Sequence, residues 1–283
     1  MASRWVALAC LLAAAACAAG AEPGLPPGRS AHRMALHDQA DDHVNYLLYV
    51  PTGAQPATGW PTILFLHGSE QRGDNPAMLE DLAILAFANQ VGGFPFIAIL
   101  PQCPRGEHWS PAVLRQLLDS VEAGLPVDRR RVYLTGFSMG GYGTWQTAAA
   151  MPGVFAAIAP LCGIADLEDV PRLVGIPTWV FHGTNDRNVP FTESVSMVKA
   201  LRKAGGTPRF TVYPEMEHDI WTMTYRDSRL YLWFLTHSLP AASGGFSVPA
   251  GAAPSTGPSS PAPSPAGSRI AASSASSDAL LER

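Results

Sequence analysis

The sequence has few charged residues and no excess of basic ones. Charged side chains make up 15% of the 283 residues, and the formal net charge is −4. Proteins that bind nucleic acid through its phosphates need clustered Lys and Arg, so nucleic acid is not expected as a partner. The chain is instead 47% hydrophobic, which is typical of a folded domain with a large core.

Motifs of several other chemistries are also missing. The sequence contains no G-x-x-x-x-G-K-[ST] loop for nucleotide phosphates and no H-E-x-x-H pair for zinc. We therefore predict no cofactor and no metal ion. One S-x-x-K tetrapeptide, Ser196–Lys199, lies on an amphipathic helical pattern without its partner motifs, and we interpret it as a chance match.

The N-terminus has an apolar run but no long one. Trp5–Ala19 is apolar and Ala-rich and follows a single positive charge. The run is too short and too weakly hydrophobic for a stable membrane span. Residues 1–21 are therefore predicted to be a signal peptide, with a mature chain that lacks a transmembrane span and is secreted or periplasmic. An N-terminal membrane anchor and lipidation at Cys17 stay open as alternatives.

Cysteine is scarce. Of four cysteines, Cys10 and Cys17 lie in the predicted signal peptide, which leaves Cys103 and Cys162 in the mature chain. An exported protein permits a disulfide between these two. Two buried free thiols are slightly favoured, because the strands predicted near them need not be neighbours.

The composition changes at both ends of the chain. Residues 22–30 are rich in Pro and Gly and are expected to form an extended leader. Residues 241–283 are mostly Ala, Ser, Pro and Gly, and such a segment cannot bury enough apolar surface to offset its ordering entropy. A disordered tail is predicted there. The folded domain is expected to span residues 31–240, and we find no internal repeat.

Between these ends, short apolar runs alternate with stretches of helical spacing. Most of the runs end near Gly or Pro, as buried strands of a parallel sheet do, and they occupy residues 44–50, 62–66, 96–100, 132–135, 155–159, 178–181 and 210–213. Apolar faces of helices are predicted over residues 78–86, 113–121 and 195–201. The alternation predicts an α/β fold with a mostly parallel, doubly wound sheet flanked by helices. Functional groups should then collect at the carboxyl ends of the strands.

The strongest functional signal is Gly-Phe-Ser-Met-Gly at residues 136–140. A predicted strand, Arg131–Thr135, precedes it and a helical stretch, Tyr142–Met151, follows it. This is the context in which G-x-S-x-G presents a nucleophilic serine on a tight turn, with glycines where strand and helix pack closely. Ser138 is the predicted nucleophile, and an ordinary serine in a glycine-rich turn is the alternative.

A serine hydroxyl needs a general base that is itself held by a third group. With this motif the chain order is Ser, then acid, then His. Of the three downstream histidines, His218 follows the last predicted strand, whereas His182 and His237 are interpreted as structural. Asp186, in a turn after the preceding strand, is the predicted acid that orients His218. The competing acids are Asp166, Glu168, Asp169 and Asp219.

The tetrahedral intermediate of such a reaction needs preorganised N–H donors. One predicted donor is the backbone amide of Met139, the residue after the nucleophile. The second is expected from the loop after an earlier strand, where Ser69 is the first choice and Glu70 the second.

Three side chains are candidates for contact with substrate. Trp109 and Trp221 are predicted to line an aromatic pocket, and core packing is the alternative for both. Arg72 is a candidate for binding a substrate carboxylate, and a structural ion pair with a nearby acid is the alternative.

These residues together resemble a bacterial group of α/β-hydrolases related to esterase D, feruloyl esterases and polyhydroxyalkanoate depolymerases, often described as phospholipase/carboxylesterase or peptidase. The matching segments are residues 60–69, 72–75, 101–104, 109–110, 128–145, 159–163, 179–183 and 204–206. The resemblance implies the α/β-hydrolase fold and the triad Ser138, Asp186 and His218. The chain departs from the family pattern at residues 70–73 and at residues 164–166, and the second departure bears on the shape of the acyl pocket.

The sequence therefore predicts a secreted serine hydrolase that cleaves a small or polymeric carboxylic ester. A peptidase on the same triad is one alternative, but no second domain or long cap insertion for peptide recognition is visible. A non-catalytic binding module is another, and the presence of all three triad residues argues against it. The acyl group, the alcohol and the oligomeric state are not determined by the sequence.

Overall fold

The protein was analysed as a computed structural model that describes residues 27–36, 43–91 and 93–241. The predicted signal peptide, the lipidation site at Cys17 and all but the first residue of the predicted tail lie outside these ranges. Within them, no helix is long and apolar enough to cross a membrane.

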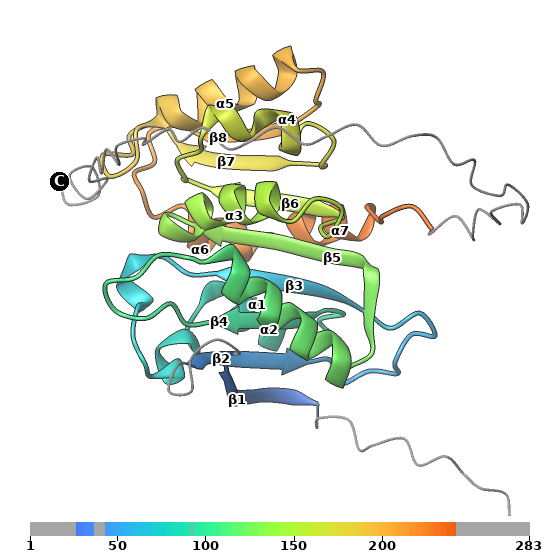
Figure 1. Cartoon of the computed structure of the whole chain (residues 1–283). Coiled ribbons are helices and arrows are strands. Elements are labelled where there is room, and N and C mark those ends of the chain that lie inside the picture. The colour runs from blue at the N-terminus through green and yellow to red at the C-terminus, as the bar shows by residue number, and fades with distance from the viewer. Residues whose placement is uncertain (1–26, 37–42, 92, 242–283) are drawn as a thin grey trace, which may run out of the picture.

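The architecture is an eight-stranded sheet in the order β1-β2-β4-β3-β5-β6-β7-β8 (Figure 1). Strands β3 to β8 run parallel to one another, whereas β1 and β2 are antiparallel to each other and β2 is antiparallel to β4. The strands are β1 (Gly28–Ala35), β2 (His43–Val50), β3 (Trp60–Leu66), β4 (Ile97–Pro101), β5 (Val127–Phe137), β6 (Ala157–Leu161), β7 (Trp179–Gly183) and β8 (Arg209–Tyr213). The predicted mostly parallel sheet is confirmed, and each apolar run falls on a strand.

Strand β1 corrects the sequence interpretation. Residues 28–30 belong to a paired edge strand and not to an unpaired leader, and they pair with residues 48–50 of β2. The strand alternates between half-buried and exposed residues and carries Arg29 and Arg33. An edge strand has only one neighbouring strand, and in β1 only alternate residues are partly covered. The strand therefore lacks the continuous apolar run that predicts the buried strands.

Helices cover both faces of the sheet. One face packs against α2 (Pro111–Gly124), α3 (Met139–Ala150), α4 (Val170–Leu173) and α5 (Phe191–Lys203). The other face packs against α1 (Ala83–Gln90), α6 (Trp221–Tyr225) and α7 (Ser228–Leu235). Adjacent residues of one strand serve the two faces, as with Leu64 and Phe65 of β3, and for this reason the central strands are apolar throughout. The doubly wound arrangement is thus confirmed.

The single helical face predicted over residues 78–86 is divided in the structure. A 3₁₀ helix, η2 (Pro76–Leu79), ends before Leu82, whose backbone is extended, and α1 begins at Ala83. Met78, counted in the predicted face, is 44% exposed. The apolar spacing that predicts one helix over residues 78–86 therefore spans two separate helices, with an extended residue, Leu82, between them. Two further 3₁₀ helices are η1 (Ser69–Gln71) and η3 (Leu167–Asp169).

Helix α7 offers a matched test of the core on one element. Phe234 is fully buried and stacks on Tyr133 of β5 at a centroid distance of 4.8 Å, whereas Leu232 is 62% exposed. We expect Phe234→Ala to lower the free energy of unfolding by about 3–5 kcal/mol, since it removes a ring from a close-packed site. Leu232→Ala should change it by less than about 0.5 kcal/mol. Urea unfolding measures both, and equal losses would contradict this packing of α7.

Candidate active site

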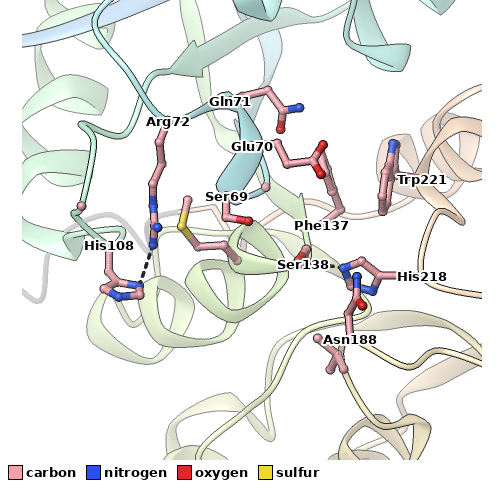
Figure 2. Close-up of a pocket in the computed structure, with 14 residues that line it drawn as sticks. Ser69, Glu70, Gln71, Arg72, His108, Phe137, Ser138, Asn188, His218 and Trp221 are labelled. Carbon is pink, nitrogen blue, oxygen red and sulfur yellow. Dashed lines mark hydrogen bonds between the residues drawn. The ribbon is translucent and has the colours of Figure 1, made fainter. Parts of the chain in front are cut away.

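Ser138 lies on the tight turn between β5 and α3. Its backbone has φ 55° and ψ −119°, in a region that non-glycine residues rarely adopt. The turn is held by a 3.0 Å hydrogen bond from the Ser138 amide to the carbonyl oxygen of Leu161 at the end of β6. The serine therefore stands at the N-terminus of α3, on the wall of a cavity (Figure 2).

The glycines that flank this turn lie where no side chain fits. A Cβ atom on Gly136 would lie 2.6 Å from the carbonyl oxygen of Leu66 in β3. A Cβ atom on Gly140 would collide with the same oxygen and would lie 2.7 Å from that of His67. The crowding predicted from the sequence motif is confirmed. It comes from the end of β3, the neighbour of β5 in the sheet, and from the start of α3, where the carbonyl oxygen of Gly140 would lie 2.5 Å from a Cβ atom on Gly136.

The structure brings Ser138, His218 and Asp186 together in one chain of hydrogen bonds. His218 Nδ1 lies 2.7 Å from Asp186 Oδ2, and His218 Nε2 lies 2.9 Å from Ser138 Oγ. A carboxylate can only accept, so Nδ1 carries the proton and Nε2 is free to accept from the serine hydroxyl. Asp186 follows β7 and His218 follows β8, so the three groups meet at the carboxyl ends of parallel strands.

The carboxylate of Asp186 is buried and fully engaged. Its Oδ1 accepts from the amides of Asn188 and Val189, each at 2.9 Å, while Oδ2 accepts from His218 and, at 3.1 Å, from His182. Burial by itself would raise the pKa of Asp186, but the hydrogen bonds from His182, His218 and Val189 outweigh it and hold the pKa well below its ordinary value. The group is therefore an anion throughout the neutral range.

The competing acids are used elsewhere. Asp166 caps η3 through the amide of Glu168, and Asp169 pairs with Arg172 at 2.8 Å. Asp219 is exposed beside His218 in the chain. Only Asp186, among these candidates, is hydrogen-bonded to a histidine.

His182 does more than fill space under the sheet edge. It is fully buried, and its Nε2 lies 3.0 Å from the carbonyl oxygen of Val189 and 3.1 Å from Asp186 Oδ2. Both partners are acceptors, so Nε2 carries the proton, and Nδ1 accepts from the Ser194 hydroxyl at 2.7 Å. The sequence interpretation of His182 as structural missed its contact with Asp186. The only signal was its spacing, four residues before the acid. His237, by contrast, bonds to the carbonyl oxygen of Trp233 and stays outside the cavity.

The two predicted oxyanion donors border the same cavity. Ser69 begins η1 directly after β3, Met139 begins α3, and both line the cavity together with Ser138. Glu70, the second choice, also lines it. The two backbone segments thus border the same cavity as the serine.

His67 fixes the loop that carries Ser69, a role that the sequence analysis did not assign. Its Nε2 accepts from the backbone amide of Cys103 at 3.0 Å, so Nδ1 carries the proton and donates to the carbonyl oxygen of Gly68 at 2.6 Å. Its own carbonyl oxygen accepts from the Trp109 indole at 3.3 Å. One buried imidazole therefore joins the end of β3 to the loop that follows β4.

The two predicted tryptophans have different positions. Trp221 lines the cavity, stacks on Phe137 at 4.6 Å and meets His218 edge-on at 5.6 Å. Trp109 is buried beneath the loop, and a Cβ atom on Gly143 would meet its ring. It lines neither of the cavities that reach Ser138, and its burial favours the alternative of core packing. The glycine in α3 makes room for the indole.

Two cavities meet at the serine. The first, of about 670 Å³, has Glu70, Arg72, His108, His218 and Trp221 among its lining residues. The second, of about 710 Å³, is lined mainly by Tyr142, Gln146, Ile164, Ala165 and Leu167. The departure from the family pattern at residues 164–166 therefore shapes the second cavity. Ser138, Met139, His108 and Val189 border both cavities, so a substrate with two parts can place one part in each.

Both described cysteines are buried free thiols, as the sequence slightly favoured. Cys162 lies near the triad, and its Sγ, a carboxylate oxygen of Asp186 and a ring nitrogen of His218 fall within 4.8 Å of one another. Such donors can hold a metal ion, but Asp186 and His218 already bond to each other. Burial also raises the pKa of the Cys162 thiol, which opposes the thiolate that a metal ion requires. The group fits a hydrogen-bonded triad better than a metal centre.

The His67 contacts predict a pH-dependent stability. Burial lowers the pKa of His67 from 6.5 to about 4, opposed by its bond to Gly68 and assisted by the positive charge of Arg72. Between these two values the unfolded chain binds the proton and the folded chain does not, so stability falls as pH drops from about 6.5 towards 4. The full loss is about 3 kcal/mol. Urea unfolding at pH 7 and pH 5 should show about half of this loss.

The matched variants are His67→Gln and His237→Gln. The first should be less stable at pH 7 but should lose much of the decrease between pH 7 and pH 5, because the group that resists protonation is gone. The second should keep that decrease. An unchanged pH dependence in His67→Gln would contradict the buried, neutral state of His67.

Comparison with known proteins gives a consistent family. A profile of the Phospholipase/Carboxylesterase family matches residues 110–233. Over 197 residues the chain is 26% identical to a bifunctional acetylxylan esterase/xylanase of Neocallimastix patriciarum, covering 66% of this chain and 27% of that protein. Over 223 residues it is 25% identical to a poly(3-hydroxyoctanoate) depolymerase of Pseudomonas fluorescens, covering 66% of this chain and 77% of that protein. The chain thus spans about a quarter of the first relative and most of the second.

Solved structures show the same fold. A thermostable esterase superposes with a TM-score of 0.68 at 29% identity, over 74% of this chain and 63% of that one. An S-formylglutathione hydrolase from Staphylococcus aureus has a TM-score of 0.55 at 17% identity, over 74% of this chain and 98% of that one, and this shows the shared fold alone. The chain therefore has the α/β-hydrolase fold, and over residues 110–233 it is similar to the Phospholipase/Carboxylesterase family.

Proposed function

We propose that the protein cleaves carboxylic esters through an acyl-enzyme on Ser138. The observation that carries this proposal is the unbroken hydrogen-bond chain from Ser138 through His218 to Asp186, at 2.9 Å and 2.7 Å, on the wall of an open cavity. Position, protonation and order of the three groups all match what nucleophilic catalysis by serine requires.

The geometry supports the following sequence of steps. As Ser138 Oγ attacks the carbonyl carbon, His218 Nε2 takes its proton, and the anionic Asp186 stabilises the imidazolium that forms. The negative charge on the carbonyl oxygen is met by the backbone amides of Met139 and Ser69. His218 then gives the proton to the leaving alcohol oxygen as the C–O bond breaks. A water molecule repeats the attack, returns its proton through His218, and releases the acid with Ser138 restored.

Relatives guide the choice of esters to test. Acetylxylan and hydroxyalkanoate esters stand in the names of the two curated relatives above, and a ferulic acid esterase shares the fold at 16% identity. Acyl-aminoacyl and dipeptidyl peptidases share the fold at 15% identity, which says nothing about activity on peptides.

Export of the mature chain is also part of the proposal, and lipidation at Cys17 is the alternative to a free exported protein. Both rest on the N-terminal sequence alone.

Covalent labelling tests the nucleophile. We expect a fluorophosphonate probe to label the wild type and Ser196→Ala, but not Ser138→Ala. Ser196 is an exposed serine of α5 in the S-x-x-K match, which makes it a suitable control. Ser138→Ala should lower kcat for 4-nitrophenyl butanoate by about 10⁴-fold or more, since nucleophile, base and acid act as a unit.

A substrate panel separates the alternatives. Acetylated xylan, methyl ferulate, polyhydroxyalkanoate and peptide anilides should be tested beside the nitrophenyl ester. Cleavage of esters but not anilides is the expected result. Cleavage of anilides alone would favour a peptidase, and a folded protein that takes no label and cleaves nothing would favour a binding module.

His182 is proposed as a positioning residue that acts through Asp186. In His182→Phe we expect kcat to fall about tenfold, because a ring is kept but the N–H donor to the Asp186 carboxylate is lost. The carboxylate then interacts more strongly with the His218 imidazolium, so the acid limb of the kcat/KM profile should move to higher pH. His237→Phe, outside the cavity, is the matched control. A lower stability with an unmoved pH profile would show that His182 only packs.

A further inference from the structure

The cavity at Ser138 has two chemically different ends. Figure 2 shows Ser138 between them, with Arg72 and His108 at one end and His218 and Trp221 at the other. The triad and the oxyanion donors account for the second end and the centre. Neither Arg72 nor His108 has a role in the proposed hydrolysis steps.

Arg72 has no carboxylate partner among the described residues. Its guanidinium donates to His108 Nδ1 at 3.3 Å, and none of the ion pairs formed within 4.0 Å in the described part of the chain includes it. Its Nε is buried without a hydrogen-bond partner. Partly buried charges are normally paired, but the ion pair that was the alternative for Arg72 is not made among the described residues. The side chain forms a hydrogen bond with the Cys103 thiol, and Arg72 lines the cavity without a counter-ion.

His108 adds a second donor beside the guanidinium. Arginine can only donate, so Nδ1 of His108 accepts, and Nε2 of this neutral imidazole carries the proton. The side chain of His108 is exposed and borders both cavities at the serine. Arg72 and His108 both line the first cavity, and N–H donors of this kind suit a planar anion such as a carboxylate.

The one acidic side chain that lines the first cavity points elsewhere. Figure 2 shows the carboxylate of Glu70 directed towards Phe137 and Trp221, away from Arg72. The positive end of the cavity is therefore not neutralised from within. The whole chain carries a formal charge of −4 and so repels anions at a distance, which means that any preference for an anionic ester has to arise locally.

We propose that Arg72 and His108 form a subsite for a carboxylate of the substrate, so that the preferred esters carry a free carboxylate close to the scissile bond. This inference rests on the proposed ester hydrolysis at Ser138 and narrows its substrate class. The carboxylate can belong to the acid part of the ester, as in a half-ester of a dicarboxylic acid, or to the alcohol part, as in an ester of a hydroxy acid. Both sources use the same recognition.

Two matched ester pairs separate these sources. The acid-side pair is 4-nitrophenyl hydrogen adipate and 4-nitrophenyl hexanoate, which differ only in the terminal carboxylate. The alcohol-side pair is the butanoate ester of 6-hydroxyhexanoate and hexyl butanoate, followed by titration of the released acid. The wild type should prefer the carboxylate member of one pair by about tenfold or more in kcat/KM, and added NaCl should reduce the preference because exposed charges are screened.

The ratio within a pair is compared across variants. Arg72→Gln should abolish the preference, and Arg72→Lys should keep part of it, because the charge remains but the planar fork is lost. Arg105→Gln is the matched control. Arg105 is an exposed cation of the same loop as His108, outside the first cavity, and its removal should leave the preference intact. Because each ratio is taken within one protein, a partial loss of folded enzyme cancels.

The outcomes are distinct. Equal kcat/KM for both members of both pairs in the wild type, or an unchanged ratio in Arg72→Gln, would overturn the subsite while ester hydrolysis stands. Absence of cleavage and of fluorophosphonate labelling would instead overturn the proposed function. If Arg72→Gln does not fold, the subsite is tested in the wild type by competitive inhibition with free adipate, with 4-nitrophenyl hexanoate as the substrate. Inhibition that weakens with added salt supports the subsite, and absence of inhibition overturns it.

Discussion

The hydrogen bonds that converge on the buried carboxylate of Asp186 organise the site. Two backbone amides, His182 and His218 share its two oxygens, so an anion that burial would otherwise disfavour is stable in the interior. The fixed carboxylate in turn fixes the tautomer of His218 and leaves its Nε2 as the acceptor for Ser138. The orientation of the base is thus set by groups on β7 and on the loop that leads to α5.

Close packing at the ends of β3 and β5 holds the other half of the site. The carbonyl oxygen of Leu66 leaves no room for side chains at residues 136 and 140, which flank the strained backbone of Ser138. The same stretch of β3 continues into His67, whose neutral imidazole bonds to Gly68 and Cys103 next to the Ser69 loop. Ser69 and Met139 then both border the cavity at the serine.

The surroundings of the serine differ in character from side to side. One cavity is lined by Phe137, Trp221, Glu70 and Arg72, and the other mainly by Tyr142 and Gln146 of α3 and by residues 164–167, which include Asp166. Solved hydrolases share the fold, whereas such loops decide what reaches the serine. The departures from the family pattern at residues 70–73 and 164–166 lie in the linings of these cavities.

Local sequence determined the elements whose signals are local. Continuous apolar runs identified the buried strands because both faces of a covered parallel strand are apolar. The spacing in Gly-Phe-Ser-Met-Gly identified the turn because its steric demand lies within five residues. Chain order then selected Asp186 and His218. Tertiary structure alone decided the rest: the pairing of β1, the break at Leu82, the burial of Trp109, and the contacts of His67, His182 and Arg72. Each of these depends on which side chains from distant segments meet at one point, and a sequence pattern carries no information about such distances.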